Sequence, residues 1–179
     1  MKKQPCLVFL VILLILSIPV ECFARSQLYH ATRRALAGKI KAHGFSTAKM
    51  KPEARFGKGL YFSASPKTAL AEKGSSDALL RAKGGQMFSK RTLDVAKPTP
   101  DKVRKIIRMP DLRGKLKKGL IGPKLGHRLG QYAGRKDRVL RYRSSKDPRG
   151  FNFFVPRKVV EKHPRIIKEV EINTAGRYR

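Results

Sequence analysis

Cysteine is nearly absent from this chain of 179 residues, because its two cysteines, Cys6 and Cys22, both precede residue 25. The rest of the sequence has no thiol, which excludes a disulfide bond or a cysteine-ligated zinc site there. The four histidines show no metal-ligand spacing, so we expect no metal site. The fold must therefore be held together by its apolar core alone.

Acidic residues are also scarce, since 12 Asp and Glu stand against 42 Lys and Arg. The formal net charge is +30. A charge of this size favours polyanionic partners such as RNA, DNA, anionic lipid or a polyphosphate-bearing ligand. Charge alone does not distinguish such a partner from a soluble basic surface that has no specific one.

Long apolar runs are missing as well. The longest, residues 7–19, falls short of the roughly 18 apolar residues that a membrane-spanning helix needs. It follows Lys2 and Lys3 and precedes small residues at Cys22 and Ala24, an order typical of a secretory signal peptide. We predict that residues 1–24 are removed and that the protein is secreted, to the periplasm or the extracellular space, with no stable membrane span.

Residues 25–179 are then predicted to form a single domain. The loss of two lysines and one glutamate with the signal peptide changes the net charge from +30 to +29. No long amphipathic helix follows residue 24, which argues against a membrane-active protein.

Hydrophobic periodicity and turn residues predict an α+β domain built from short elements. Gly44 is placed to end a first helix, and Ser65-Pro66 to begin a second. Residues 45–47 should be extended and residues 74–86 irregular. We expect strands at 28–32, 60–63, 87–95, 139–143, 151–155 and 166–172, and helices at 33–43, 67–73 and 102–109.

The stretch 111–138 is a basic insertion rich in glycine and lysine. It is either a surface loop system or one short helix near residues 127–132. Between Asp101 and Arg143 there are fifteen Lys or Arg and three Asp, a local net charge of +12. Such a segment can follow the phosphates of RNA or DNA, or it can simply be a solvated face.

Two short motifs carry the strongest functional signal. Tyr29-His30-Ala31-Thr32 ends the first strand, and Phe56-Gly57-Lys58-Gly59-Leu60-Tyr61-Phe62-Ser63 forms a turn and the next strand. A histidine and a tyrosine on neighbouring strands would build a cleft with one polar anchor and one stacking platform, which suits a nucleotide. We therefore expect the rings of His30 and Tyr61 to face each other across a slot.

With Gly44-Phe45, these motifs resemble the first two motifs of the ADP-ribosyltransferase superfamily, in particular its poly(ADP-ribose)-polymerase-like branch and polymorphic bacterial toxins. A second resemblance, over residues 92–156, is to the distal half of small bacterial NAD-consuming toxins. It includes Leu93-Asp94-Val95 and the segment 142–154. The resemblance implies a split, mixed β-sheet with short flanking helices that binds NAD, as a substrate, in a cleft.

The resemblance also implies roles for single residues. His30 would hydrogen-bond the adenosine-side ribose, and the backbone of Ala31 would hold the nicotinamide carboxamide. Tyr61 would stack on the nicotinamide ring, with Ser63 beside its amide. The pyrophosphate would be bound by one of three cations: Arg55, Lys58 and Arg143.

The third catalytic position departs from the family pattern. Many relatives have a glutamate there, which stabilises the cation formed when the nicotinamide–ribose bond breaks, but here the sequence is Gly150-Phe151-Asn152-Phe153. An amide can bind a ribose hydroxyl, yet it cannot neutralise a cation. The predicted catalytic set is therefore His30, Tyr61 and Asn152.

These inferences predict a secreted NAD-dependent ADP-ribosyltransferase-like toxin or effector, which passes ADP-ribose to a protein, a nucleic acid or water. A toxin of this kind would call for a neutralising partner protein. Two alternatives stay open. One is a secreted basic ribonuclease-like toxin with His30 as its general base, and the other is a catalytically impaired nucleic-acid-binding module of the same fold.

Overall fold

The computed structural model describes residues 27–74, 76–96, 103 and 121–174. The predicted signal peptide, the first part of the 111–138 insertion and the predicted helix at 102–109, apart from Val103, lie outside the described residues. No helix in the part that is described is both long enough and apolar enough to cross a membrane.

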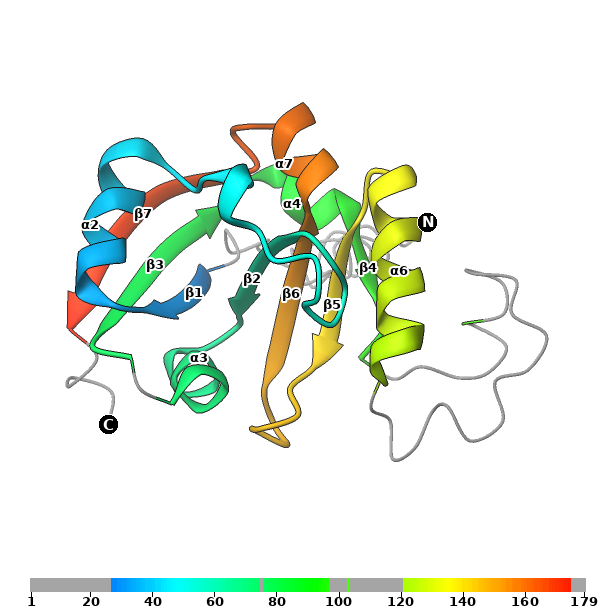
Figure 1. Ribbon diagram of the computed structural model, residues 1–179, viewed down its shortest axis with the longest axis horizontal. Helices are drawn as coiled ribbons and strands as arrows, with labels where there is room; N and C mark the ends of the chain where they lie inside the picture. Colours follow the sequence, from blue (N-terminus) through cyan, green and yellow to red (C-terminus); the bar gives the residue numbers. More distant parts are fainter. Residues whose placement is uncertain (1–26, 75, 97–102, 104–120, 175–179) are drawn as a thin grey trace, which may run out of the picture.

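Seven strands form one curled, mixed sheet in the order β4-β5-β6-β2-β1-β3-β7 (Figure 1). Strands β4 and β5 run parallel, and all other neighbours are antiparallel. The predicted class, α+β with a mixed sheet and few helices, is thereby confirmed. The strands are β1 (Gln27–Thr32), β2 (Gly59–Ser63), β3 (Ala78–Gly84), β4 (Thr92–Asp94), β5 (Val139–Arg143), β6 (Phe151–Pro156) and β7 (Ile167–Thr174).

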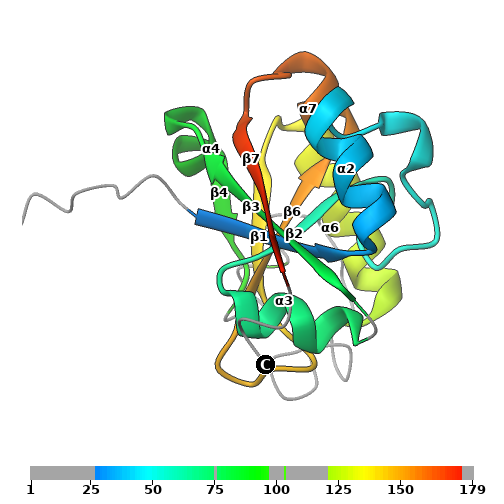
Figure 2. The same cartoon turned by 90° about the vertical axis from the view of Figure 1, so that its left-hand side faces the viewer.

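Helices cover both faces of the sheet (Figure 2). They are α2 (Arg34–His43), α3 (Pro66–Lys73), α4 (Gln86–Arg91), α6 (Pro123–Arg135) and α7 (Arg157–Lys162), with a 3₁₀ turn η1 (Thr47–Lys49). Alternate residues of a strand point to opposite faces, so each strand contributes to two apolar clusters. One face packs under α2, α4 and α7, and the other packs under α3 and α6. We call these the α2 face and the α6 face.

The two predicted motifs meet at a weakly paired seam in the middle of the sheet. Strand β1 is paired with β3 at six positions, but with β2 only at Tyr29 and Ser63. We call this junction the β1–β2 seam. Because most of its length lacks a regular ladder, backbone groups of β2 are left there for side chains to bind.

Local signals placed several boundaries correctly. Gly44 ends α2 with a positive φ of 75°, and its N–H is bonded to the carbonyl of Ile40. The Ser65 hydroxyl caps α3 by accepting the N–H of Thr68, and Pro66 follows as the first helical residue. The predicted strands at 28–32, 60–63, 139–143, 151–155 and 166–172 all correspond to observed strands.

Other predictions were wrong. The segment 74–86 contains β3, a strand paired on both sides whose alanines and leucines are buried. Alanine is uncommon in strands, but here burial between the neighbouring strands β1 and β7 outweighs its weak preference for other conformations. The strand predicted at 87–95 begins as helix α4, and only residues 92–94 of it form a strand. In the segment predicted to be extended, residues 45–47, Thr47 instead begins the 3₁₀ turn η1. Helix α7 was not predicted.

The described part of the 111–138 insertion confirms the second interpretation, a helix near residues 127–132, but the helix is longer than predicted. It forms a 13-residue helix, α6, which packs along β5 and β6 (Figure 1). Its glycines make this close approach possible. A Cβ added at Gly130 would lie 1.8 Å from the carbonyl oxygen of Phe56, and one at Gly126 would lie 2.6 Å from that of Arg55. The helix therefore holds the loop that precedes β2.

Candidate functional site

His30 and Tyr61 meet at the β1–β2 seam through a side-chain to backbone hydrogen bond. The imidazole Nδ1 lies 2.8 Å from the carbonyl oxygen of Tyr61. A carbonyl only accepts hydrogen bonds, so Nδ1 carries the proton, and in the neutral ring Nε2 is left as an acceptor. Burial lowers the pKa of His30, and nearby Lys73 lowers it further, against the opposing effect of the bond to Tyr61. The neutral ring is therefore favoured.

The two rings themselves lie on opposite faces of the sheet. His30 packs edge-on against Phe45 and Phe62, on the α2 face. Tyr61 packs against Phe154, on the α6 face, with ring centroids 5.0 Å apart. The expectation that they face each other across a slot was wrong, because consecutive residues of β2 alternate and it is Phe62 that shares a face with His30. The predicted cleft between a polar anchor and a stacking ring is therefore not formed by this pair.

The Tyr61 hydroxyl is held by the turn that precedes its strand. It accepts the N–H of Phe56 at 3.0 Å and donates to the carbonyl of Gly57 at 3.0 Å. Burial raises the pKa of Tyr61 to about 12, although the hydrogen bond from Phe56 and the charge of Arg55 act in the opposite direction. The Tyr61 phenol is therefore a fixed, neutral ring that lies half-buried on the α6 face of the sheet.

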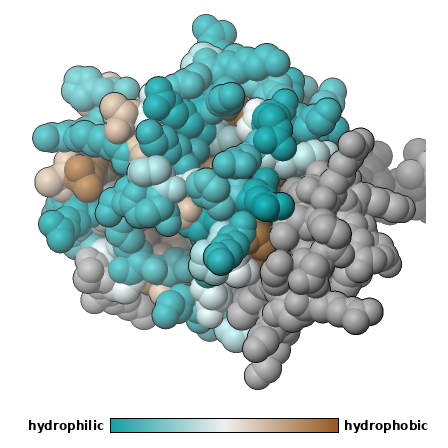
Figure 3. Space-filling view, turned by 45° about the vertical axis from the view of Figure 1, so that its right-hand side comes forward, coloured by the Kyte–Doolittle hydropathy of each residue, from teal (hydrophilic) through white to brown (hydrophobic). Residues whose placement is uncertain are grey.

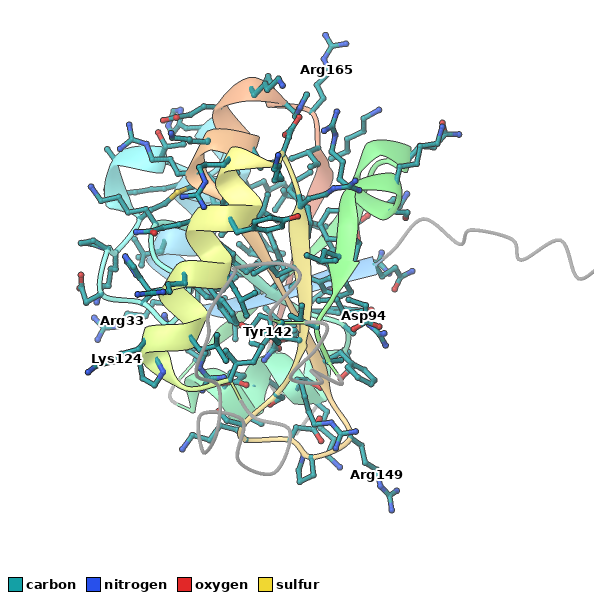
Figure 4. All side chains as sticks on the ribbon, turned by 90° about the vertical axis from the view of Figure 1, so that its right-hand side faces the viewer. Arg33, Asp94, Lys124, Tyr142, Arg149 and Arg165 are labelled. Atoms are coloured by element: carbon teal, nitrogen blue, oxygen red, sulfur yellow. The ribbon has the colours of Figure 1, made fainter. Side chains whose placement is uncertain are left out.

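A row of polar side chains crosses four adjacent strands beside Tyr61. Ser63 pairs with Tyr29 on one side and with Asn152 on the other, and Asn152 pairs with Tyr142. Paired residues point to the same face of a sheet, so all four side chains lie on the α6 face. Ser63, Asn152 and Tyr142 are buried, and Tyr142 lies near the centre of the molecule beside α6 (Figure 4).

The centre of this row is a hydrogen-bonded group that we call the Asn152 cluster: Ser63, Glu72, Ser144 and Asn152. The Ser63 hydroxyl donates to Oδ1 of Asn152 at 2.6 Å. Nδ2 of Asn152 donates to Oε1 of Glu72 at 2.7 Å, and the Ser144 hydroxyl donates to the same oxygen at 2.6 Å. Both ends of the Asn152 amide are thus satisfied, and a carboxylate is brought to the third predicted catalytic position.

Glu72 is the residue that sequence reasoning missed. It lies near the end of α3, four residues after Thr68, whose hydroxyl donates to Oδ2 of Asp147 at 2.7 Å. Residues four apart lie on the same side of a helix. The polar positions 65, 68 and 72 at this spacing were the available signal, but the sequence did not indicate which segment they would contact.

The predicted cations and Ala31 are distributed unevenly. Arg55 is close to the Asn152 cluster, because its guanidinium donates to the hydroxyl of Ser145 at 3.2 Å. Lys58 is exposed in the turn before β2. Arg143 follows Tyr142 and so points to the other face, where its buried Nε has no hydrogen-bond partner among the described residues. Ala31 is buried under Ala69 of α3, on the same face as Tyr61.

Tyr142 lies close enough to Tyr61, Glu72 and Arg55 for all three to affect its pKa. Burial raises the pKa of Tyr142, and the nearby Tyr61 and Glu72 raise it further, whereas Arg55 lowers it. The site therefore combines a fixed phenol, a second neutral phenol, a carboxylate and a guanidinium. Within the described residues, no group of three His, Cys, Asp or Glu is arranged to hold a metal ion.

No protein-family model and no curated protein matches this chain. Any functional conclusion must therefore come from the motifs and from the arrangement of these side chains.

Proposed function

We propose that the protein is a secreted, NAD-dependent ADP-ribosyltransferase-like toxin or effector. It would break the nicotinamide–ribose bond of NAD and pass ADP-ribose to a protein, a nucleic acid or water. One observation carries this proposal beyond the sequence motifs. Tyr61, Ser63 and Asn152, chosen from the sequence, share one face of two paired strands, with Arg55 nearby. Export would depend on the predicted signal peptide, residues 1–24.

The chemistry of these groups suits a dinucleotide substrate. An aromatic ring such as that of Tyr61 offers a stacking surface for a flat heterocycle. Ser63 and Asn152 are hydrogen-bonded to each other, and Asn152 holds the carboxylate of Glu72 at this site, an acceptor of the kind that binds sugar hydroxyls. The guanidinium of Arg55 suits a pyrophosphate, because it can donate two parallel hydrogen bonds to phosphate oxygens.

The β1–β2 seam supports the finer proposal, a split sheet of the ADP-ribosyltransferase type. Regular pairing between β1 and β2 is limited to Tyr29 and Ser63, and His30 binds the Tyr61 carbonyl instead of a ladder partner. In this proposal Nε2 of His30 accepts a hydrogen bond from a ribose hydroxyl at the seam, and the backbone of Ala31 holds the carboxamide. The imidazole and the phenol then act from the two sides of one seam.

The reaction needs orientation and charge stabilisation more than acid–base catalysis. Nicotinamide leaves as a neutral molecule with the bonding electron pair, so no proton has to be delivered to it. The ribose is left with positive charge that the site must stabilise. A fixed ring that holds the leaving group, together with anchored sugar hydroxyls, lowers the entropic part of the barrier.

Nicotinamide release from NAD by the purified protein, followed by chromatography, tests the proposal. We expect turnover by the wild-type protein and a loss of about 100-fold or more in His30→Ala and Tyr61→Ala, because each removes a substrate-orienting group. His43→Ala, at the exposed end of α2, is the matched control and should keep the wild-type rate. Wild-type protein without turnover, or equal rates in all variants, would refute the proposal.

The same experiment separates the two alternatives. RNA cleavage without NAD would favour the ribonuclease-like toxin, and it should then depend on His30 as a base. Salt-sensitive binding of RNA or DNA without nicotinamide release would favour the catalytically impaired nucleic-acid-binding module.

A further inference from the structure

The Glu72 carboxylate is hydrogen-bonded by uncharged side chains. Its Oε1 accepts hydrogen bonds from Ser144 and Asn152, and no ion pair to Glu72 is present in the part of the chain that the structure describes. Among the described residues, four other acids, Asp94, Asp137, Glu161 and Glu171, form ion pairs with basic side chains. Asp147, like Glu72, is bound by uncharged groups. The charge of Glu72 is therefore oriented without being neutralised.

Two consecutive hydrogen bonds, which begin at Ser63 on the strand that contains Tyr61, set the orientation of Glu72. Ser63 donates to Oδ1 of Asn152, which fixes the amide so that Nδ2 points at Glu72. The bond between Asn152 and Glu72 joins residues 80 positions apart in the sequence. Three elements, β2, β6 and α3, thus converge on one carboxylate near Tyr142.

We propose that Glu72 is the catalytic carboxylate of this site and that Asn152 is the residue that positions it. This inference rests on the proposed function and supplies the group that the third motif lacks. Glu72 would hydrogen-bond a hydroxyl of the nicotinamide-side ribose and face its anomeric carbon. Asn152 and Ser144 would hold Oε1, which leaves Oε2 for the substrate.

The proposed reaction has two steps, bond cleavage and capture of the sugar cation. The bond between the anomeric carbon and the nicotinamide nitrogen breaks, and its electron pair leaves with neutral nicotinamide. The negative charge of Glu72 stabilises the resulting sugar cation. Water, or a nucleophile of the acceptor, then forms a bond to the anomeric carbon and loses a proton to solvent. The products are nicotinamide and ADP-ribose, free or attached to its acceptor.

Asp147, the other nearby acid, already accepts hydrogen bonds that stabilise the turn before β6. Its Oδ2 accepts from the Thr68 hydroxyl, and its Oδ1 accepts the N–H of Arg149. The bond from Thr68 is also the main reason why the pKa of Asp147 is lowered. Both oxygens therefore hold the backbone and α3 together, so Asp147 is the weaker candidate.

The variant Glu72→Gln removes the negative charge but keeps the size and the hydrogen-bond acceptor of the side chain. A glutamine keeps an Oε1 that accepts from both Ser144 and Asn152, so the cluster can persist. We expect nicotinamide release to fall by about 100-fold, the usual order for losing one transition-state charge partner. The Kd for NAD and the thermal midpoint should stay close to wild type. Glu161→Gln, which removes a surface carboxylate of α7, is the matched control and should keep full activity.

The outcomes separate this inference from the proposed function. If the wild-type protein turns over NAD and Glu72→Gln keeps the rate, the role of Glu72 is refuted and the proposed function stands. If Glu72→Gln lowers the thermal midpoint and weakens NAD binding with kcat unchanged, Glu72 is structural and the inference also fails. If the wild-type protein releases no nicotinamide, both proposals fall together. A higher rate in Glu72→Asp than in Glu72→Gln would support the negative charge as the cause of the rate loss.

Discussion

His30 is a half-buried imidazole whose neutral form the structure favours, because burial is the main cause of its lowered pKa. In the unfolded chain its pKa returns to about 6.5. Between the lowered value and about 6.5, the unfolded state binds more protons than the folded state, so the free energy of unfolding rises with pH in this window. Stability should therefore be lost as pH falls below about 6.5.

We expect the thermal midpoint to decrease between pH 7.5 and pH 5.5, and this decrease to be smaller in His30→Gln, whose side-chain N–H can still reach the Tyr61 carbonyl. Differential scanning calorimetry at several pH values measures it. His127→Gln controls for the loss of a histidine in general. An identical pH dependence in His30→Gln and the wild type would contradict the role assigned to burial.

Tyr61 combines a structural hydroxyl with a ring available for stacking. Tyr61→Phe keeps the ring against Phe154 but leaves the N–H of Phe56 and the carbonyl of Gly57 without this partner. We expect a loss of about 1–2 kcal/mol in the free energy of unfolding, measured with urea, because unpaired backbone groups cost roughly this much.

The affinity for NAD should change little in Tyr61→Phe, since the ring is retained. Tyr29→Phe is a suitable control, because the hydrogen bond of its hydroxyl within the described residues is to the exposed Gln27. A fall in NAD affinity without any loss of stability would show that the hydroxyl, rather than the ring, serves the substrate.

Helix α6 acts as a clamp on the loop that carries Phe56 and Gly57. Its glycines at positions 126 and 130 bring the helix against the backbone of this loop. Gly130→Ala would place a methyl group within 1.8 Å of the Phe56 carbonyl oxygen, so the helix or the loop must move. We expect a loss of about 1–3 kcal/mol in the free energy of unfolding, typical of overpacking. Activity should fall with it, because the same loop holds Tyr61.

Gly134 lies on the same helix and provides a matched control. A Cβ there would lie 3.6 Å from Pro156, which is an ordinary contact. Gly134→Ala should therefore stabilise the protein by up to about 1 kcal/mol, because alanine is the better helix former. Equal stability changes at positions 130 and 134 in urea unfolding would show that close packing of α6 does not matter.

At the scale of the whole molecule, positive charge is the main feature of the sequence. The described surface in Figure 3 is mostly hydrophilic, and the sequence carries a net charge of +30. In the nucleic-acid-binding alternative, RNA or DNA would bind this surface with release of counterions, so the logarithm of the binding constant would fall linearly with the logarithm of the salt concentration. We expect binding of a random RNA oligomer to weaken by at least about tenfold between 50 and 200 mM NaCl.

Nicotinamide release should be less sensitive to salt than RNA binding, because NAD carries only two phosphates. Fluorescence anisotropy and the nicotinamide assay over the same salt series measure the two effects. RNA binding that does not change with salt would indicate recognition of bases instead of phosphates.

Much of the fold could be predicted because its signals are local. Gly44 and Ser65-Pro66 fix helix ends through their own backbone and side-chain geometry. The strand that contains Tyr61 has flanking glycines and aromatic residues that favour extended structure. Strand β3 could not be predicted, because its alanines and leucines become a strand only between β1 and β7.

By itself the sequence determined the charge, the lack of thiols after residue 22 and most of the strands, and it indicated Tyr61, Ser63 and Asn152 but not Glu72. Only the tertiary structure decided which of those residues share a face. It separated His30 from Tyr61 and joined Glu72 to Asn152 across 80 positions. The physical reason is that the side-chain direction in a strand depends on register, and register is set by pairing between distant segments that no local pattern specifies.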